Sequence, residues 1–380
     1  MYEPLLHSFS TVVGALFSWR PADDVRRILI YKLDHIGDVL LATPALRGIR
    51  RRFPQAEIKI VVGEWSRSVL ESNPNIDGIV IYNSKEFARP PYTSHQYADL
   101  KRNLGSWKPD LVIGLRDDWQ TLRHALFMGV RQINRGMVHL RQWIERKRTN
   151  RPSSHETDRL WAILEPLDIK PEPVERPEYF VTEGERKLAM EFALAHGIES
   201  PFAVVQAGTS IRLKEWSLDR FAEAARHINS QHGMQIVLIG SPEEVRRTSL
   251  LAEMIQDIDP IDISGKLTLR DTAALMERAE LYLGSDGGAM HVASALGVPT
   301  VGLFGPGSYH IFRPVGRHAT AISHLFPCSP CRMTTCIRPN DTCMQAITIE
   351  EVIRETDGLM ARTKQRSTAG GVAYSYRSPI

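Results

Sequence analysis

The sequence contains few cysteines, no long apolar run and little net charge, and each of these absences excludes a class of protein. The only 4 cysteines among 380 residues lie between 328 and 343, which excludes a fold-wide disulfide framework and suits a reducing compartment. No run of about 18 apolar residues occurs, so we expect no membrane-spanning helix. Because 47 Lys and Arg nearly balance 44 Asp and Glu, leaving a net charge of +3, nucleic acid is not the expected partner.

The N-terminal segment 1–25 is apolar but does not have the features of a signal peptide. Its apolar part, Leu5 to Trp19, lacks a preceding basic region and a small-residue cleavage site. Two interpretations stay open: a helix packed on the body of the protein or a frayed end, and an anchor at a membrane surface.

From Arg26 onward, short apolar runs alternate with amphipathic stretches, which is typical of an α/β protein with parallel sheets. Strands are expected at 26–33, 57–63, 77–82 and 110–115, and again at 202–208, 234–240, 280–285 and 298–305. A proline-rich stretch separates the two series. The sequence therefore predicts a first domain at 26–170, a linker at 171–182, a second domain at 183–362 and a disordered tail at 363–380.

The loop after the first expected strand ends in Asp38, at the start of a helical pattern over 39–53. This aspartate is either a helix N-cap with no further role or a carboxylate that takes a proton from a substrate hydroxyl. Pro44 suits the first turn of a helix but would kink a helix that begins at Asp38, so the helix start stays open.

Two loops of the second half contain groups that suit an anionic ligand. Residues 209–216 gather hydroxyls and Lys214 between a strand and a helix, although a solvated loop would have the same composition. Residues 284–291 follow a strand and open a helix, so backbone N–H groups near Gly287 and Gly288 can approach an anion closely. No G-x-G-x-x-G follows either first strand, which counts against a nicotinamide or flavin enzyme.

These segments together resemble the glycosyltransferase family of the bacterial lipopolysaccharide heptosyltransferases. The resemblance covers roughly residues 26–355, and its carriers are KLDHIGDVLLATPALRGIRRRFP near the start, Lys214-x-Trp216, and SDGGAMHVASALGVPTVGLFGP at 285–306. It implies a GT-B fold, in which two doubly wound, Rossmann-like domains face each other across a cleft. The N-terminal domain would bind the acceptor and the C-terminal domain the nucleotide-sugar donor, with inverting transfer that requires neither a metal nor another cofactor.

The resemblance also implies roles for single residues. Asp38 matches the catalytic base, and Lys214 matches the lysine that binds the donor phosphates during catalysis. Glu244 matches a donor-binding glutamate but is explained equally well as the capping-box partner of Ser241. Gly287 stands where the best-known members carry Thr, so one hydroxyl contact to phosphate is missing. The full donor-binding set is Thr209, Ser210, Lys214, Glu244, Asp286, Gly287, Gly288, Met290 and His291.

The implied reaction is transfer of heptose from ADP-heptose to a lipopolysaccharide core acceptor, in the cytoplasm or at the cytoplasmic face of the inner membrane. The residues do not decide the sugar, the nucleotide, the acceptor or the oligomeric state. Three alternatives therefore stay open: a member of the family with another sugar or acceptor, a nucleotide-sugar epimerase, and a non-catalytic protein that binds a sugar nucleotide.

A basic segment in the first half is a candidate for acceptor binding. Between 131 and 151, seven basic residues stand against one acidic residue, which indicates either a solvated face or a surface for acceptor phosphates or anionic lipid. Together with the loop before this segment, it provides the candidate acceptor ligands Arg116, Arg141 and Arg148.

The four cysteines form a compact group in the sequence. Their spacing, C-x2-C-x4-C-x6-C, is close to that of zinc sites. We favour reduced structural thiols or a local disulfide, and zinc remains the alternative. The residues concerned are Cys328, Cys331, Cys336 and Cys343.

Overall fold

The computed structural model describes residues 25–88, 91–116, 119–130, 132–134, 155–171, 176–316, 318–331, 335–338 and 340–368. The chain divides into two compact units, Met1–Thr182 with His310–Phe312, and Glu183–Tyr309 with Arg313–Ile380. The apolar segment 1–24 lies outside the described residues, and so does the basic segment from 135 to 151 with Arg141 and Arg148.

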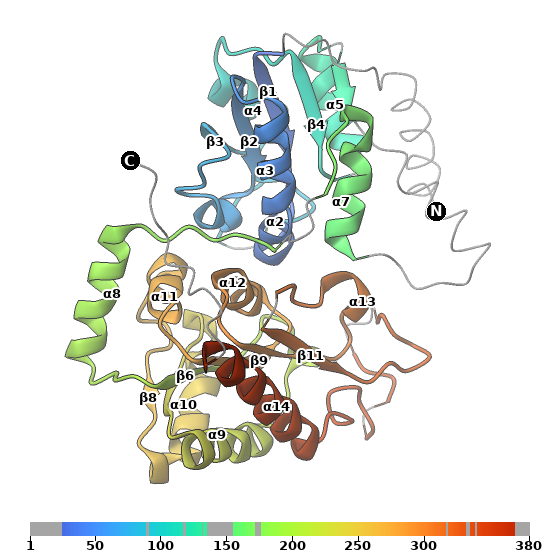
Figure 1. The fold of residues 1–380 in the computed structure, drawn as a ribbon. Helices are drawn as coiled ribbons and strands as arrows, with labels where there is room; N and C mark the ends of the chain where they lie inside the picture. Colours follow the sequence, from blue (N-terminus) through green and yellow to red (C-terminus); the bar gives the residue numbers. More distant parts are fainter. Residues whose placement is uncertain are drawn as a thin grey trace. The chain divides into compact units, whose positions relative to one another are not determined.

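The first unit is built on a five-stranded parallel sheet with the strand order β3-β2-β1-β4-β5 (Figure 1). Ile30 of the first strand is paired with Ile60 on one side and Ile113 on the other, and all three are fully buried. Burial on both faces explains why these strands read as continuous apolar runs. The strands are β1 (Arg27–Tyr31), β2 (Glu57–Val62), β3 (Gly78–Ile81), β4 (Leu111–Gly114) and β5 (Gln132–Asn134).

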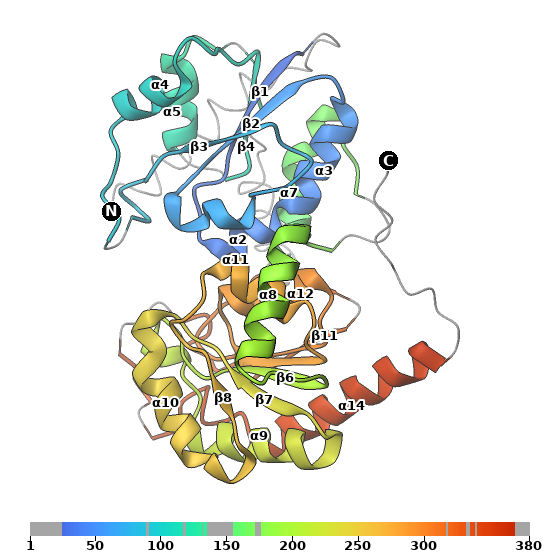
Figure 2. The same cartoon turned by 90° about the vertical axis from the view of Figure 1, so that its left-hand side faces the viewer.

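Helices cover both faces of this sheet. Figure 2 shows α4 and α5 on one side and α3 and α7 on the other. The side with α4 and α5 contains a core cluster that includes Leu29, Val112, Leu100 and Leu122. The helical elements are α2 (Ile36–Leu41), α3 (Thr43–Arg52), η1 (Glu64–Val69), α4 (Tyr97–Leu104), α5 (Trp119–Phe127), α7 (Glu156–Leu164) and η2 (Glu165–Leu167).

The helical pattern after β1 forms two helices, α2 and α3, so the helix start that the sequence left open is resolved by a break between Leu41 and Thr43. Pro44 lies in the first turn of α3, where a missing N–H costs nothing. The hydroxyl of Thr43 donates to the carbonyl of Leu40 at 2.8 Å and closes the junction. The N-cap residue of α2 is His35, which places Asp38 inside the first turn and rules out its interpretation as an N-cap.

The second unit contains a six-stranded parallel sheet with the order β11-β10-β9-β6-β7-β8. The strand at 319–323 was not expected, because most of its residues are small or polar and it lies at the sheet edge. The strands are β6 (Phe202–Gln206), β7 (Gln235–Leu238), β8 (Ile261–Asp262), β9 (Leu281–Ser285), β10 (Thr300–Phe304) and β11 (Ala319–Ser323).

Helices cover both faces of the second sheet as well. In Figure 2, α9 and α14 lie on one side, and α8, α11 and α12 lie on the other. The main core cluster joins Phe221 of α9 and Val352 of α14 to Val205 and Leu283 of the sheet. The helical elements are α8 (Glu183–Ala195), η3 (Arg212–Lys214), α9 (Leu218–His232), η4 (Pro242–Glu244), α10 (Val245–Met254), η5 (Gln256–Ile258), α11 (Leu269–Met276), α12 (Gly288–Leu296), α13 (Tyr309–Phe312) and α14 (Ile349–Thr368).

The expected disordered tail begins too early, because α14 continues to Thr368. No glycine or proline occurs from 359 to that residue, so nothing in the chain stops the helix at the expected boundary. The hydroxyl of Thr363 also donates to the carbonyl of Leu359 at 3.0 Å within the helix. Residues 369–380 lie outside the described part of the chain.

Candidate active site

A buried lysine at the carboxyl end of β1 is surrounded by acidic side chains. Lys32 is 1% exposed, and its ammonium lies 3.1 Å from Asp34 Oδ2 and 2.9 Å from Glu156 Oε1. Arg159 donates to the other oxygen of Glu156 at 2.8 Å. Burial lowers the pKa of Lys32, but the neighbouring carboxylates outweigh it and raise this pKa above its usual range. The lysine is therefore charged inside the first unit.

Arg116, an expected acceptor ligand, is part of the same charged group. Its guanidinium donates to Asp34 Oδ1 at 2.6 Å and to Glu86 Oε1 at 2.7 Å, and it lies over the Phe87 ring at 4.4 Å from the centroid. Burial alone would raise the pKa of Asp34, but Lys32 and Arg116 lower it overall. In this structure Arg116 holds an ionised carboxylate, so acceptor binding by Arg116 stays a prediction.

Asp38 lies beside these charges in the first turn of α2 and is partly buried. Burial is the main cause of an upward shift in its pKa, and the negative charges of Asp34 and Glu156 add to this shift. The cations Lys32 and Arg116 oppose the shift, and the resulting pKa of Asp38 is about 7. A carboxyl group that titrates near neutral pH is well suited to general base catalysis.

Lys32 and Glu156 were not recognised from the sequence, although they set the charge around Asp38. The signal for Lys32 was present: it is a single lysine that interrupts the apolar run of the first strand. Glu156 gave no signal, because it is 124 residues away from Lys32 along the chain and only the fold brings the two together.

In the second unit, a buried tryptophan fixes the loop that follows β6. Trp216 is 1% exposed, its indole N–H donates to the carbonyl of Ile347 at 3.0 Å, and its ring meets Phe221 edge to face at 5.0 Å. This anchor explains the Lys214-x-Trp216 element: the tryptophan holds the chain, and the lysine two residues earlier is held in place with it.

Lys214 lies against the loop that follows β9. Its ammonium is 2.6 Å from Asp286 Oδ2, and the two side chains are 19% and 10% exposed. An ammonium group has three donors, so this ion pair leaves the lysine able to bind further oxygens. The structure thus brings together two of the predicted donor residues that are 72 positions apart in the sequence.

The loop from Asp286 leads directly into α12, whose N-cap residue is Gly287. A helix start presents backbone N–H groups to an anion. Gly287 has an extended φ of −169°, and a Cβ built there would have only Ser285 O nearby, at 3.7 Å. The backbone at this position therefore has room for a Cβ atom and does not itself require glycine.

Met290 and His291 are buried in the first turns of α12. A Cβ on Gly302 of β10 would lie 2.5 Å from Met290 Sδ, which means that the methionine packs directly on the backbone of the neighbouring strand. Both side chains are buried within the unit, and a direct donor contact for either stays a prediction.

Glu244 fulfils its capping role and also lies at the loop after β6. Its carboxylate accepts from the backbone N–H of Ser241 at 3.0 Å in a complete capping box, and from the side chain of Gln206 at 3.2 Å. A Cβ on Gly208 would lie 2.7 Å from Glu244, just before the partly buried Thr209 and the exposed Ser210. The capping interpretation is confirmed, and the position leaves the donor role open.

The cysteine segment does not have the geometry of a zinc site. Its four cysteines are free thiols. Among the described residues, one group of three or more metal-binding side chains has its ligand atoms within 4.8 Å of one another, and it contains no cysteine. The segment lines a cavity of about 500 Å³ together with Trp216 and Arg247. The cysteine sulfurs thus do not form a preassembled tetrahedral site in this structure, and the choice between reduced thiols and zinc stays a prediction.

Comparison with known proteins identifies a family. The model of glycosyltransferase family 9 (heptosyltransferase) matches residues 97–341. The lipopolysaccharide core heptosyltransferase OpsX of Haemophilus influenzae is 26% identical over 302 residues, which cover 75% of this chain and 80% of that protein.

Solved structures agree with this match. The crystal structure of a family 9 glycosyl transferase from Veillonella parvula has a TM-score of 0.73 and 25% identity, covering 90% of this chain and 99% of that one. The E. coli heptosyltransferase WaaC with ADP-2-deoxy-2-fluoro heptose has a TM-score of 0.59 and 19% identity, covering 87% and 99%. The fold is therefore GT-B, as expected. In the described part of the chain, no helix combines the length and hydropathy of a membrane span.

Proposed function

Since the chain belongs to glycosyltransferase family 9, the heptosyltransferase family, we propose that it transfers heptose from ADP-heptose to the core of a lipopolysaccharide or lipooligosaccharide. The family establishes a glycosyltransferase, and the names of the relatives support the heptose donor and the core acceptor. The observation that carries the proposal from this chain itself is the pairing of Lys214 with the Asp286 loop at the start of α12.

The proposed reaction is a single displacement at the anomeric carbon of the donor. An acceptor hydroxyl gives its proton to Asp38 as its oxygen forms the new glycosidic bond. The bond from the anomeric carbon to the diphosphate oxygen breaks, and ADP leaves with the electron pair. Asp38 is suited to this step because its pKa of about 7 combines basicity with ionisation at neutral pH.

In this proposal, groups of the second unit stabilise the negative charge of the leaving diphosphate. Lys214 contributes a full positive charge, and the N-terminus of α12 contributes aligned N–H groups. Asp286 orients the ammonium and keeps it beside the loop. In this proposal the cation that stabilises the leaving group is a lysine, and the transfer needs no further cofactor.

Binding of nucleotide sugars tests the proposal directly. The purified chain would be titrated by calorimetry with ADP-heptose and with UDP-, GDP- and CMP-sugars, each alongside its free nucleotide. Tight binding of ADP-heptose, followed by transfer to a core acceptor, is the expected result. Preference for another nucleotide sugar would refute the heptose donor, and conversion of the sugar nucleotide without any acceptor would indicate an epimerase instead.

In a pH profile of kcat/KM, the activity should fall below about pH 7. The position of this acid limb of the profile should depend on Glu156. Below this pH, Asp38 is protonated and cannot accept a proton, so kcat/KM should decrease about tenfold per pH unit. The Glu156→Gln substitution removes a negative charge that raises the pKa of Asp38. The acid limb should therefore move to lower pH in a pH profile of kcat/KM.

Glu86→Gln is the matched control for this pH prediction. Glu86 also binds a cation of the charged group, at 2.7 Å from Arg116, but it is not among the main causes of the Asp38 shift. The acid limb of the Glu86→Gln variant should therefore lie at the same pH as that of the parent protein. An unchanged limb in Glu156→Gln, or an equal shift in both variants, would contradict the assignment of the limb to Asp38.

A further inference from the structure

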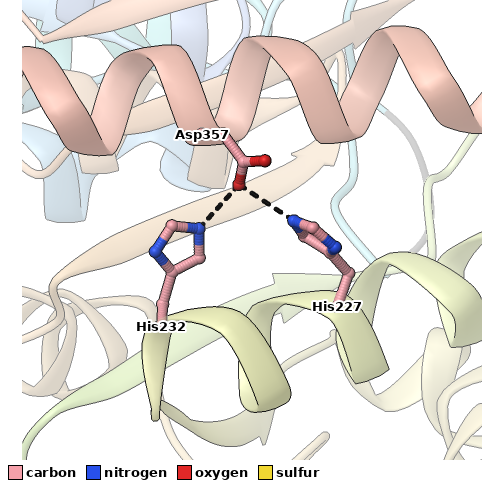
Figure 3. A group of neighbouring side chains, drawn as sticks. All are labelled: His227, His232 and Asp357. Carbon is pink, nitrogen blue, oxygen red and sulfur yellow. Dashed lines mark hydrogen bonds and ion pairs between the residues drawn. The ribbon is translucent and has the colours of Figure 1, made fainter.

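Two histidines and an aspartate meet where α9 and α14 pack against each other in the second unit. Figure 3 shows His227 and His232 from α9 on either side of Asp357 from α14. Their Nε2 atoms lie 2.9 Å and 2.8 Å from the same oxygen, Asp357 Oδ1. The two imidazole rings are 6.0 Å apart between centroids and nearly perpendicular. Three donor atoms thus converge from two helices.

We propose that His227, His232 and Asp357 form a binding site for a divalent transition-metal ion, with zinc as the expected occupant. The three donor atoms lie within 4.8 Å of one another, and two imidazole nitrogens with one carboxylate oxygen are a donor set that zinc prefers. This inference is independent of the proposed function, because none of the three residues belongs to the predicted donor or acceptor set.

The two distances from Asp357 to the histidines suit an ion after a small movement. Zinc bonds of about 2.1 Å in a tetrahedron separate two donor atoms by roughly 3.4 Å. The carboxylate of Asp357 would have to retreat by about half an ångström to reach this spacing. Its side chain is 45% exposed, whereas those of His227 and His232 are 21% and 11% exposed. The aspartate is therefore free to move toward solvent, and water can supply the fourth ligand.

The orientation of the rings and the end of α9 also favour a cation. In the metal-free protein each Nε2 atom lies within hydrogen-bond distance of Asp357 Oδ1. When an ion binds, the ring proton resides on Nδ1 and the Nε2 lone pair faces the metal. His232 is the last residue of α9, where helix carbonyls favour positive charge.

The basic side chains nearest in sequence are directed to other partners. Arg226 pairs with Asp257 at 2.7 Å, and Arg354 lies 4.0 Å from Glu355. An ion held by the two histidines and Asp357 would join α14 to α9, so its expected effect is on the stability of the second unit.

Metal titration of the full-length protein tests this site. After dialysis against a chelator and its removal, calorimetry with Zn²⁺ alone should show one equivalent bound at this site, and saturating Zn²⁺ should raise Tm. His227→Asn and Asp357→Asn should each weaken this binding by at least about 100-fold, because loss of an outer-shell partner already costs about 10- to 100-fold. His324→Asn is the matched control, since His324 meets a single carboxylate, Glu351, at 3.0 Å.

Co²⁺ spectroscopy separates this site from the cysteine segment. Histidine and carboxylate ligands give visible bands without the intense near-ultraviolet charge transfer of a thiolate complex. The expected spectrum of the parent protein has visible bands that disappear in His227→Asn and Asp357→Asn and persist in His324→Asn. No metal uptake, uptake by thiolates only, or equal uptake in all variants would overturn the proposal and leave a hydrogen-bonded link between the two helices.

Discussion

Asp38→Asn is expected to lower kcat by about 100- to 10,000-fold, the range that a general base contributes, without weakening donor binding. The amide has nearly the shape of the carboxyl group but cannot take the proton from the acceptor hydroxyl. The predicted donor-binding residues lie in the second unit, so the affinity for the nucleotide sugar should be unchanged. Single-turnover kinetics with a core acceptor and calorimetry with the donor measure the two quantities separately.

Thermal stability provides the control for Asp38→Asn. The folded-state pKa of about 7 lies above the ordinary value of 3.8, so ionisation of Asp38 costs stability as the pH rises from about 4 to 7, and this cost persists above pH 7. The uncharged Asn avoids it. The variant should therefore be at least as stable as the parent at pH 8. Turnover at the parental rate would contradict the role of Asp38 as the base.

Lys214→Met is expected to have the second largest effect, a loss of about 100- to 1,000-fold in kcat/KM, as when one electrostatic stabiliser of a transition state is removed. The variant lacks the cation that we propose to face the leaving diphosphate. It also leaves Asp286 without its partner at 2.6 Å, so that a carboxylate repels the phosphates. Both effects should appear as weaker donor binding in calorimetry and as slower transfer.

A double variant and a distant lysine distinguish these two effects. Lys214→Met with Asp286→Asn removes the repelling charge, so it should regain part of the donor affinity while transfer stays slow. Lys266→Met is the matched control, because Lys266 lies in the same unit and donates to the backbone carbonyl of Asp262 at 2.7 Å. Unchanged donor affinity in Lys214→Met would refute its role at the phosphates.

Much of the fold could be predicted, because strands buried on both faces appear as apolar runs that require no knowledge of their neighbours. The strand at 27–31 is an example. The edge strand β11 could not be predicted in this way, because Ile322 is its only large apolar residue. Pro44 indicated a break in the first helical pattern. The hydrogen bond of Thr43 at the junction of α2 and α3 is visible only in the structure.

The candidate site divides in the same way between local and distant information. Local motifs predicted Asp38, Lys214 and Asp286, because each stands beside a turn or helix start whose chemistry can be read within a few residues. The contacts that set their properties are not local. Lys214 meets Asp286 across 72 positions, and Glu156 reaches Lys32 across 124.

The order of residues alone thus determined the α/β class, the two series of strands, the family resemblance and the residues that carry reactive groups. All of these depend on patterns within one segment or on the order of segments. Only the tertiary structure decided which charges surround Asp38, how Trp216 anchors the Lys214 loop, and that His227 and Asp357 meet. Shifts in pKa and the sharing of one ligand by two residues depend on distances between atoms in space. These distances are established only when the chain folds, so they cannot be read from the sequence.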